Sequence, residues 1–300
     1  MTKTAFIAIV GCPNVGKSSI LNRLLGQKIA IVSEKPQTTR TRITGILTDG
    51  ETQLVFTDTP GFHRPKTKLG ENMVKAVTDS IADVDACLFV VEPSGELREK
   101  ELELIERFKT EHIPVILAIN KVDTVSEKEL LMQRIFEISS LFDFSAVVPV
   151  SARHGDNFDA LLSELKALAQ ESVHFFPEDT LTDQPERVLM SEIVREKMLR
   201  LLDKEIPHGT AVAIEKMRER EGRDDLVDIE ATIYCEKESH KGIIIGKKGD
   251  MLKRISTRAR EDMEKFLCCK VNLKCWVKVK EDWRNREGLI RNFGLDGESY

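Results

Sequence analysis

The sequence has no long hydrophobic run. Its uninterrupted apolar stretches, such as Cys87 to Val91 and Gly242 to Gly246, are far shorter than the roughly 20 residues that a membrane-spanning helix needs. The amino terminus, Met1 to Val10, has the pattern of a short buried strand, and no small-residue cleavage site of the secretory type follows it. We therefore expect no membrane span and a cytoplasmic location.

Cysteine is scarce, and its spacing does not indicate a metal site. The 300 residues include 6 cysteines, none of them in a CxxC pair, and those near the carboxyl end lack histidines at metal-ligand spacing. Tandem repeats and low-complexity segments are also lacking. These absences argue against a disulfide framework or a zinc module, and they predict reduced, packed thiols.

What is present indicates a folded protein of two domains. Hydrophobic residues make up 41% and charged residues 32% of the chain, which is too apolar for a disordered protein, and 300 residues exceed the usual size of one domain. The net charge of −5 hides an asymmetry, because Lys237 to Lys280 holds 13 Lys and Arg against 5 Asp and Glu. This basic stretch is where we expect an anionic partner, although a charge run alone more often marks a solvated face.

The first half alternates strand-like and amphipathic segments, which predicts an α/β fold with a mostly parallel sheet and helices on both faces. An antiparallel hairpin is expected at the sheet edge around Asp49-Gly50. The predicted strands are Ala5 to Val10, Ile43 to Leu47, Leu54 to Thr57, Ala86 to Val91, Val115 to Ile119 and Val147 to Val150. The predicted helices are Lys17 to Leu25, Glu96 to Thr110, Glu127 to Ser140 and Asn157 to Ala169.

The second half has a different order of elements. Residues 173–185 are polar and punctuated by proline, which is typical of a linker. A helix (Arg187 to Lys204), two strands (Thr210 to Met217 and Val227 to Glu236), two helices joined by a glycine-lysine loop, and a strand (Val271 to Lys280) are expected to follow. This order predicts a smaller α+β domain over 186–282, and 283–300 has the pattern of an exposed, partly helical tail.

A phosphate-binding loop is the strongest motif. Gly11 to Ser18, GCPNVGKS, matches GxxxxGK[ST] between an apolar strand and an amphipathic helix. The glycines let backbone N–H groups close around a polyphosphate, the helix contributes its positive N-terminal end, Lys17 reaches the β and γ phosphates, and Ser18 offers Mg²⁺ a hard oxygen. The predicted phosphate-binding residues are Gly11, Asn14, Val15, Gly16, Lys17, Ser18, Ser19 and, from the next motif, Gly61.

A second motif, Asp58 to Gly61 (DTPG), follows the predicted strand that ends at Thr57. This position places a carboxylate at the carboxyl edge of the sheet, beside the first loop. We expect Asp58 to hold Mg²⁺ through water and the N–H of Gly61 to meet a γ phosphate. Such a turn is ordinary loop chemistry by itself, and the phosphate loop upstream is what favours the functional interpretation.

A third motif predicts selection of guanine. Asn120-Lys121-Val122-Asp123 follows an apolar strand, and one carboxylate can accept both N1–H and N2–H₂ of guanine, donors that adenine lacks. Asp123 therefore selects the base, while Asn120 bonds its opposite edge and braces the loop and the Lys121 stem covers one face. A further loop, Ser151-Ala152, can offer a backbone N–H to the guanine carbonyl.

These four elements, in this order, resemble the translation-factor-related GTPases, and residues 36–40 resemble the first switch of the TrmE and Era branch. The resemblance implies a Ras-like G domain with bound GTP or GDP and Mg²⁺. By likeness Thr39, with Thr38 as the alternative, joins Ser18 and Asp58 at the metal. The implied first switch is Pro36, Gln37, Thr38, Thr39 and Arg40, and the implied second switch is Asp58, Thr59, Pro60, Gly61 and Phe62.

One position departs from the Ras pattern. Ras-like GTPases place a water-orienting glutamine where this chain has Phe62, which cannot orient water by a hydrogen bond. In the TrmE and Era relatives an asparagine of the phosphate loop supports a potassium ion, and Asn14 occupies that position. The resemblance thus implies potassium-assisted hydrolysis. His63 as a catalytic base is the alternative, although a loop histidine is more often only solvated.

A GxxG loop stands between two helices of the basic stretch. Its glycines permit close backbone approach and its lysines offer charge to phosphates, which is RNA-binding chemistry. GxxG alone also serves as an ordinary helix connection, but the element order and charge of Glu186 to Lys280 resemble a type II KH domain. Tyr234 and Trp276 are expected to pack, with base stacking as the alternative. The predicted RNA-binding residues are Gly246, Lys247, Lys248, Gly249, Lys253 and Arg254.

The combination resembles the bacterial Era family over nearly the whole chain: a GTPase domain (1–172), a linker (173–185), a KH domain (186–282) and a tail (283–300). The resemblance implies a monomeric GTPase that binds the 3′ end of 16S rRNA during assembly of the 30S subunit. It also implies peripheral association with the cytoplasmic face of the cell membrane. An RNA scaffold or cell-cycle checkpoint adaptor with incidental GTPase activity is the alternative function. A tRNA-modification GTPase is disfavoured because the carboxyl-terminal cysteine pattern of the TrmE enzymes is missing.

Overall fold

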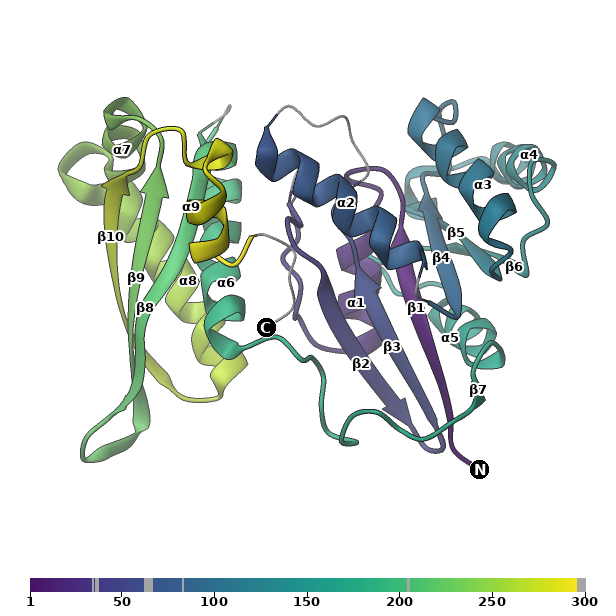
Figure 1. The fold of residues 1–300 in the computed structure, drawn as a ribbon, viewed down its shortest axis with the longest axis horizontal. Coiled ribbons are helices and arrows are strands. Elements are labelled where there is room, and N and C mark those ends of the chain that lie inside the picture. Colours follow the sequence, from purple (N-terminus) through teal and green to yellow (C-terminus); the bar gives the residue numbers. More distant parts are fainter. Residues whose placement is uncertain (34, 36–37, 62–66, 83, 204–205, 296–300) are drawn as a thin grey trace. The chain divides into compact units, whose positions relative to one another are not determined.

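The computed structural model describes residues 1–33, 35, 38–61, 67–82, 84–203 and 206–295. Its internal contacts divide the chain into two compact units, which are drawn as ribbons in Figure 1. The first unit comprises Met1–Val32, Thr39–Pro65 and Gly70–Asp183. The second comprises Gln184–Tyr300 together with two short segments of the first half, Ser33–Thr38 and Lys66–Leu69. Thr38 and Thr39, both in the predicted first switch, therefore belong to different units.

The described strands of the first unit form one sheet of seven strands in the order β2-β3-β1-β4-β5-β6, with β7 paired to β1. Pairing is parallel except for the β2-β3 hairpin and for β7, as expected for an α/β fold with an added hairpin. Strands β4 and β5 are buried at every residue, and all of these residues except Asn120 are apolar. The strands are β1 (Lys3–Val10), β2 (Ile43–Asp49), β3 (Thr52–Asp58), β4 (Ala86–Val91), β5 (Val115–Asn120), β6 (Ala146–Val150) and β7 (Gln170–Glu171).

The helices of the first half include one that the sequence analysis missed. Helix α2 buries Leu69, Met73, Val77 and Ile81, and this spacing of four residues gives it a continuous apolar face. Helix α3 begins three residues later than predicted, because Glu101 accepts a hydrogen bond from the Arg98 backbone N–H (2.8 Å) and caps the first turn. The helices are α1 (Lys17–Leu25), α2 (Lys68–Ala82), α3 (Glu99–Glu111), α4 (Lys128–Ser139) and α5 (Phe158–Ala167).

The second unit has a three-stranded sheet in the order β10-β9-β8, in which β10 is parallel and β8 antiparallel to β9. Side chains of α6 and α8 pack with one face of this sheet, and the buried residues include Met198, Ile233 and Ile255. The strands are β8 (Thr210–Arg220), β9 (Arg223–Cys235) and β10 (Lys270–Val279). The helices are α6 (Glu186–Leu201), α7 (Glu238–Ile245), α8 (Asp250–Leu267) and α9 (Glu287–Asn292).

The carboxyl-terminal segment is more buried than predicted. Trp283 and Ile290 are both fully buried, and the indole N–H of Trp283 donates a hydrogen bond to the backbone carbonyl of Gly209 (3.0 Å). The prediction of an exposed tail is therefore wrong at these two residues. The segment is buried because the Trp283 ring combines a large apolar area with one polar group, the indole N–H, which has a hydrogen-bond partner inside the second unit.

Several features are absent from the described part of the chain. No helix there is long and apolar enough to cross a membrane. The same residues contain no group of three or more His, Cys, Asp and Glu side chains arranged to hold a metal ion. All six cysteines are free thiols, and burial raises the pKa of Cys87 to about 12 and that of Cys12 to about 11. These two thiols are consequently protonated and weakly reactive at neutral pH.

Candidate functional site

The loop between β1 and α1 requires its two glycines. Gly11 has φ of 149°, and a Cβ atom there would lie 2.4 Å from the backbone oxygen of Val90. Gly16 has φ of 102°, and its Cβ would lie 2.1 Å from Nδ2 of Asn120. Any side chain at either position would strain the backbone and collide with the carboxyl-terminal end of β4 or β5. The loop backbone therefore has the compact form that anion binding at the start of α1 demands.

Lys17 is held inside this loop. Its side chain is 6% exposed, and its ammonium group donates to the backbone carbonyls of Gly11 and Cys12, each at 3.1 Å. Burial lowers the pKa of Lys17, and the carboxylate of Asp58 partly opposes this effect. The amine is thus placed in the loop that the sequence predicts to surround a polyphosphate.

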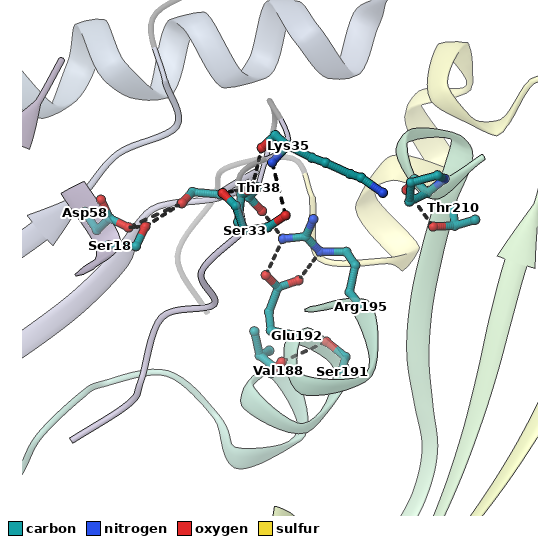
Figure 2. Close-up of polar contacts among 12 residues, drawn as sticks. Ser18, Ser33, Lys35, Thr38, Asp58, Val188, Ser191, Glu192, Arg195 and Thr210 are labelled. Carbon is teal, nitrogen blue, oxygen red and sulfur yellow. Dashed lines mark hydrogen bonds and ion pairs between the residues drawn. The ribbon is translucent and has the colours of Figure 1, made fainter. Parts of the chain in front are cut away.

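Three oxygen-bearing side chains meet beside the loop. Ser18 Oγ donates to Asp58 Oδ2 (2.6 Å) and lies 3.0 Å from Oγ1 of Thr39, as Figure 2 shows for Ser18 and Asp58. Thr39 Oγ1 is 3.3 Å from the same carboxylate oxygen. The other carboxylate oxygen, Asp58 Oδ1, is buried and has no hydrogen-bond partner among the described residues. A cluster of hard oxygens with one unsatisfied acceptor fits Mg²⁺.

Burial makes the Asp58 carboxylate costly. The side chain is fully buried, and this raises its pKa from 3.8 to about 6, although Lys17, Ser18 and Thr39 act in the opposite direction. A bound cation would offset the cost by supplying a positive charge next to the carboxylate. The raised pKa of Asp58 and its unsatisfied oxygen therefore both indicate that a cation would be favourable at this carboxylate.

The geometry favours Thr39 over Thr38 as the metal-binding threonine. Thr38 Oγ1 donates to the backbone carbonyl of Lys35 (2.6 Å), whereas the Thr39 hydroxyl lies with Ser18 and Asp58. Arg40, the last residue of the predicted first switch, is buried. Pro36 and Gln37 lie outside the described residues.

The DTPG segment stays close to the phosphate loop. Thr59 is buried and donates from its hydroxyl to the backbone carbonyl of Ile9 (2.8 Å), which fixes the segment against β1. A Cβ atom on Gly61 would lie 2.7 Å from Cα of Pro13, so glycine permits a close approach of the two backbones. Phe62, of the predicted second switch, and His63, the alternative catalytic base, lie outside the described residues.

Asn120 braces two loops. Its Nδ2 donates to the Val15 backbone carbonyl (2.8 Å), its Oδ1 accepts from the Ala152 N–H (3.0 Å), and the side chain is nearly buried. The bracing that was predicted is thus visible in the structure. In the Ser151-Ala152 loop, which is predicted to offer a backbone N–H to the guanine carbonyl, the Ala152 N–H donates to Asn120.

Asp123 is ionised and oriented. One of its carboxylate oxygens accepts a hydrogen bond from Ser151 Oγ (2.7 Å), and this bond is the main cause that lowers the pKa of Asp123. His154 and Arg153 add favourable charge. A carboxylate fixed in this way can accept the two adjacent donors of guanine, and Ser151 therefore serves by positioning Asp123.

Two charged residues that were not predicted from the sequence, Glu92 and Arg98, link these loops. Glu92 accepts from Lys121 Nζ (2.5 Å) with one oxygen and from Arg98 Nη2 (2.8 Å) with the other. Arg98 in turn donates to the backbone carbonyl of Pro13 in the phosphate loop (3.3 Å). A signal was present, because Glu92 directly follows β4, at the sheet edge where Asp58 and Asn120 end their strands.

The GxxG loop has the backbone that its sequence predicts. Gly246 and Gly249 have φ of 75° and 82°, and a Cβ atom on Gly246 would lie 2.7 Å from Cβ of Met251. Lys247 and Lys248 between them are exposed. The loop can therefore bring two ammonium groups and its own backbone close to a phosphodiester chain.

Exposed cations continue along α8. Lys253 and Arg254 are exposed, and within the described residues neither they nor the two loop lysines form an ion pair. Arg260, further along the helix, is instead paired with Glu264 (3.0 Å). Tyr234 packs as expected, because its ring lies 4.7 Å from that of Phe293. Within the described residues, four cations without an ion pair thus lie in the GxxG loop and the first turns of α8.

Within the second unit, α6 contacts the segment before Thr39. Arg195 is 2% exposed and donates from its guanidinium to the backbone carbonyl of Thr38, as Figure 2 shows. Glu192, one turn earlier on α6, accepts two hydrogen bonds from Arg195 (2.7 and 2.5 Å) and orients it. Sequence alone offered no signal for this contact, since it joins residues 157 positions apart.

Comparisons with known proteins agree with these two sites. Residues 6–121 match the family model described as 50S ribosome-binding GTPase, and residues 205–284 match the KH domain model. The "GTPase Era" of Clostridioides difficile (strain 630) is 49% identical over 300 residues, which cover 99% of each chain.

Two solved structures resemble the chain over nearly its whole length. One is Aquifex aeolicus Era bound to GDP·AlF4⁻, and the other is an Era in complex with MgGDPNP and nucleotides 1506–1542 of 16S ribosomal RNA. Each has a TM-score of 0.94 and 39% sequence identity, and each match covers 98% of this chain and 99% of the other. The chain therefore belongs to the Era family of GTPases and combines a Ras-like P-loop GTPase domain with a carboxyl-terminal KH domain.

Proposed function

We propose that this GTPase binds the 3′ end of 16S rRNA through its KH domain and acts in assembly of the 30S subunit. The observation that carries the proposal is the presence, in one chain, of an oxygen cluster suited to Mg²⁺ and a GxxG loop whose lysines have no ion-pair partner among the described residues. A relative that is 39% identical was solved with both MgGDPNP and nucleotides 1506–1542 of that RNA. The same pair of ligands suits the two sites of this chain.

In this proposal each part of the nucleotide site has a separate task. The phosphate loop binds the β and γ phosphates through its backbone N–H groups and Lys17, and Asp123 selects guanine. Ser18, Asp58 and Thr39 hold Mg²⁺, which neutralises charge on the phosphate oxygens when bound. Asn14 supports a potassium ion.

Arg195 supplies a physical reason for RNA affinity to depend on the nucleotide. It holds the carbonyl of Thr38, and the next residue, Thr39, places its hydroxyl at the oxygen cluster. A nucleotide that fixes Thr39 therefore restrains the adjoining Thr38 peptide, whose carbonyl accepts the hydrogen bond from Arg195 of the RNA-binding unit. Nucleotide binding and RNA binding can be coupled in this way only if the GDP-bound and GTP-bound states of the protein differ in their contacts.

The test is the affinity for a single-stranded RNA with the 16S 3′-terminal sequence, measured by fluorescence anisotropy with GDP and with GDPNP. We expect the dissociation constants for this RNA with GDP and with GDPNP to differ by at least about fivefold. This ratio corresponds to a coupling free energy of about 1 kcal/mol. Lys247→Asp should weaken binding about 10-fold in both states, because a phosphate contact is lost and a repulsive charge is added. Arg195→Met should bring the two affinities together.

The matched control is Lys128→Asp, which changes an exposed lysine of α4 in the other unit and should leave RNA affinity unchanged. Equal affinities with GDP and GDPNP in the unmodified protein would contradict the coupling. RNA binding that Lys247→Asp does not weaken would contradict the role of the KH domain.

The dependence of GTP hydrolysis on potassium distinguishes a GTPase switch from the alternative function, a scaffold or adaptor with incidental GTPase activity. We expect multiple-turnover GTP hydrolysis to be at least about fivefold faster in potassium than in sodium, and Asn14→Ala to remove most of this difference, because a positioned cation stabilises charge that develops on the phosphates. Activity near background in both salts, with RNA present, would instead favour a scaffold or checkpoint adaptor whose GTPase activity is incidental.

The proposal further places the protein in the cytoplasm as a monomer with peripheral association at the membrane. The feature that supports a membrane contact is the basic stretch from Lys237 to Lys280, which anionic headgroups attract as they would any basic surface. RNA competes for the same charges. Membrane association should therefore weaken when the KH domain is saturated with RNA.

A further inference from the structure

The chain has two tryptophans, and their environments differ sharply. Trp283 is fully buried, with a bonded indole N–H and its ring 5.5 Å from that of Phe293. Trp276, on β10, is 44% exposed, and within the described residues its side chain has no hydrogen bond and no aromatic partner. Burying a tryptophan side chain stabilises a protein more than burying almost any other side chain. An indole that is half exposed on a sheet is therefore an apolar surface that a binding partner can still cover.

The alternation of β10 places Trp276 on the sheet face away from the core. Residues 271, 273, 275, 277 and 279 belong to or pack against the hydrophobic core beneath α6 and α8, whereas Lys274, Trp276 and Lys278 are exposed. Strand β10 is also the edge of its sheet, as the order β10-β9-β8 requires. The indole is therefore accessible both from the open face and from the strand edge.

Two lysines flank the indole on the same face. Successive residues on one face of a strand are about 6.6 Å apart, so the Cα atoms of Lys274 and Lys278 are about 13 Å apart with Trp276 between them. In the described part of the chain neither lysine forms an ion pair, whereas nearby cations do: Arg220 pairs with Asp228 and Arg284 with Glu236. Glu230 lies opposite Lys274 on β9, but the two side chains form no ion pair. The pattern is a stacking surface between two lysines that have no ion-pair partner among the described residues.

A single-stranded nucleic acid matches this pattern. A base offers a flat face to an exposed aromatic ring, and the phosphates on either side of that base meet cations. The position of this surface also favours RNA as its ligand. Strand β10 contacts α7, and α7 leads into the GxxG loop, as Figure 1 shows. An RNA strand that leaves the GxxG loop along this edge reaches the open face without leaving the KH unit.

We propose that Lys274, Trp276 and Lys278 form a second single-stranded RNA surface on the KH unit, in which one base stacks on the indole and the ammonium groups contact the flanking phosphates. This inference rests on the RNA binding of the proposed function and extends it to a face that the GxxG loop does not occupy. Tyr234 shows the contrast, since the ring of Phe293 already covers it on the neighbouring strand.

The two tryptophans allow a direct measurement. The full-length protein with Mg²⁺ and GDPNP is titrated with a 20-nucleotide single-stranded RNA of the 16S 3′-terminal sequence while tryptophan fluorescence is recorded. Because Trp283 is fully buried, we expect stacking on Trp276 to quench the emission and to protect the remainder from acrylamide. An unchanged emission and unchanged acrylamide quenching at saturating RNA would overturn the inference.

Variants test the same surface without fluorescence. Trp276→Leu should weaken binding of the 20-nucleotide RNA about 10-fold, whereas Trp276→Phe, which keeps a ring, should stay within about twofold. Lys274→Gln with Lys278→Gln should reduce the steepness of the dependence of log K on log salt by about 1.4, as expected for two phosphate contacts. Far-ultraviolet circular dichroism and thermal unfolding of each variant check that the KH unit, which has its own hydrophobic core, remains folded.

Phe136→Leu is the matched control, because Phe136 is an aromatic residue that is 79% exposed on α4 of the other unit. It should bind RNA like the unmodified protein. If Lys247→Asp weakens binding and Trp276→Leu does not, the second surface is wrong and the KH function stands. RNA binding that neither substitution weakens would contradict the proposed function and the second surface together.

Discussion

Replacing Asp123 by asparagine is expected to weaken GTP binding at least 100-fold and to create affinity for XTP. The carboxylate accepts two guanine donors, whereas an amide presents one acceptor and one donor, so the amide N–H₂ faces guanine N2–H₂ without a partner. A polar site left unpaired in this way discriminates strongly between ligands. Xanthine has a carbonyl where guanine has N2–H₂, and it can therefore accept from the amide.

The measurement is the dissociation constant of fluorescent GTP and XTP analogues for both proteins. Asp143→Asn, at an exposed loop residue, is the control and should leave both constants unchanged. Ser151 should behave as a positioning residue, because its hydroxyl orients Asp123 (2.7 Å), and Ser151→Ala should weaken GTP binding less than Asp123→Asn does. A ratio of GTP to XTP affinity that Asp123→Asn leaves unchanged would refute guanine selection by this carboxylate.

Asp58→Asn is expected to slow single-turnover GTP hydrolysis by about 100- to 1000-fold at saturating nucleotide. The substitution removes the charge that would face Mg²⁺ while preserving the shape of the side chain, and lost stabilisation of transferring phosphoryl charge has effects of this size. Asp143→Asn again serves as the control. Hydrolysis at an undiminished rate in millimolar Mg²⁺ would exclude Asp58 from the metal site.

In EDTA, Asp58→Asn should remove one contribution to the pH dependence of the free energy of unfolding. The pKa of Asp58 is raised from 3.8 to about 6, so the native carboxyl binds a proton more readily than the unfolded one between these values. The free energy of unfolding of the metal-free protein consequently falls as pH rises through this window, by about 1.3 kcal/mol between pH 5 and 7 from this group alone. The difference between the unmodified protein and Asp58→Asn in urea unfolding isolates this contribution. A difference that is constant with pH would contradict the raised pKa.

Short sequence patterns predicted much of the nucleotide site because its chemistry depends on local backbone. The phosphate loop needs glycines at fixed spacing, and the structure has φ of 149° at Gly11 and 102° at Gly16. The hairpin and the helix order of the KH domain were likewise predicted, because apolar periodicity marks buried faces over a few residues. Helix α2 carried the same signal, with apolar residues four positions apart, and was nonetheless missed.

Long-range contacts could not be predicted in this way. The link from Lys121 through Glu92 and Arg98 to Pro13 joins three loops that only the folded sheet brings together. The burial of Trp283 depends on the carbonyl of Gly209, 74 positions earlier. Such contacts depend on tertiary packing, which a local pattern does not encode.

The most direct test of the central claim is ultraviolet crosslinking of the protein to RNA in a bacterial lysate supplemented with GDPNP, followed by sequencing of the attached RNA. Our account predicts one dominant site at the 3′ end of 16S rRNA, reduced by Lys247→Asp and unaffected by Lys128→Asp. Scattered sites, or a peak on tRNA, would contradict it and leave a GTPase whose RNA partner lies elsewhere.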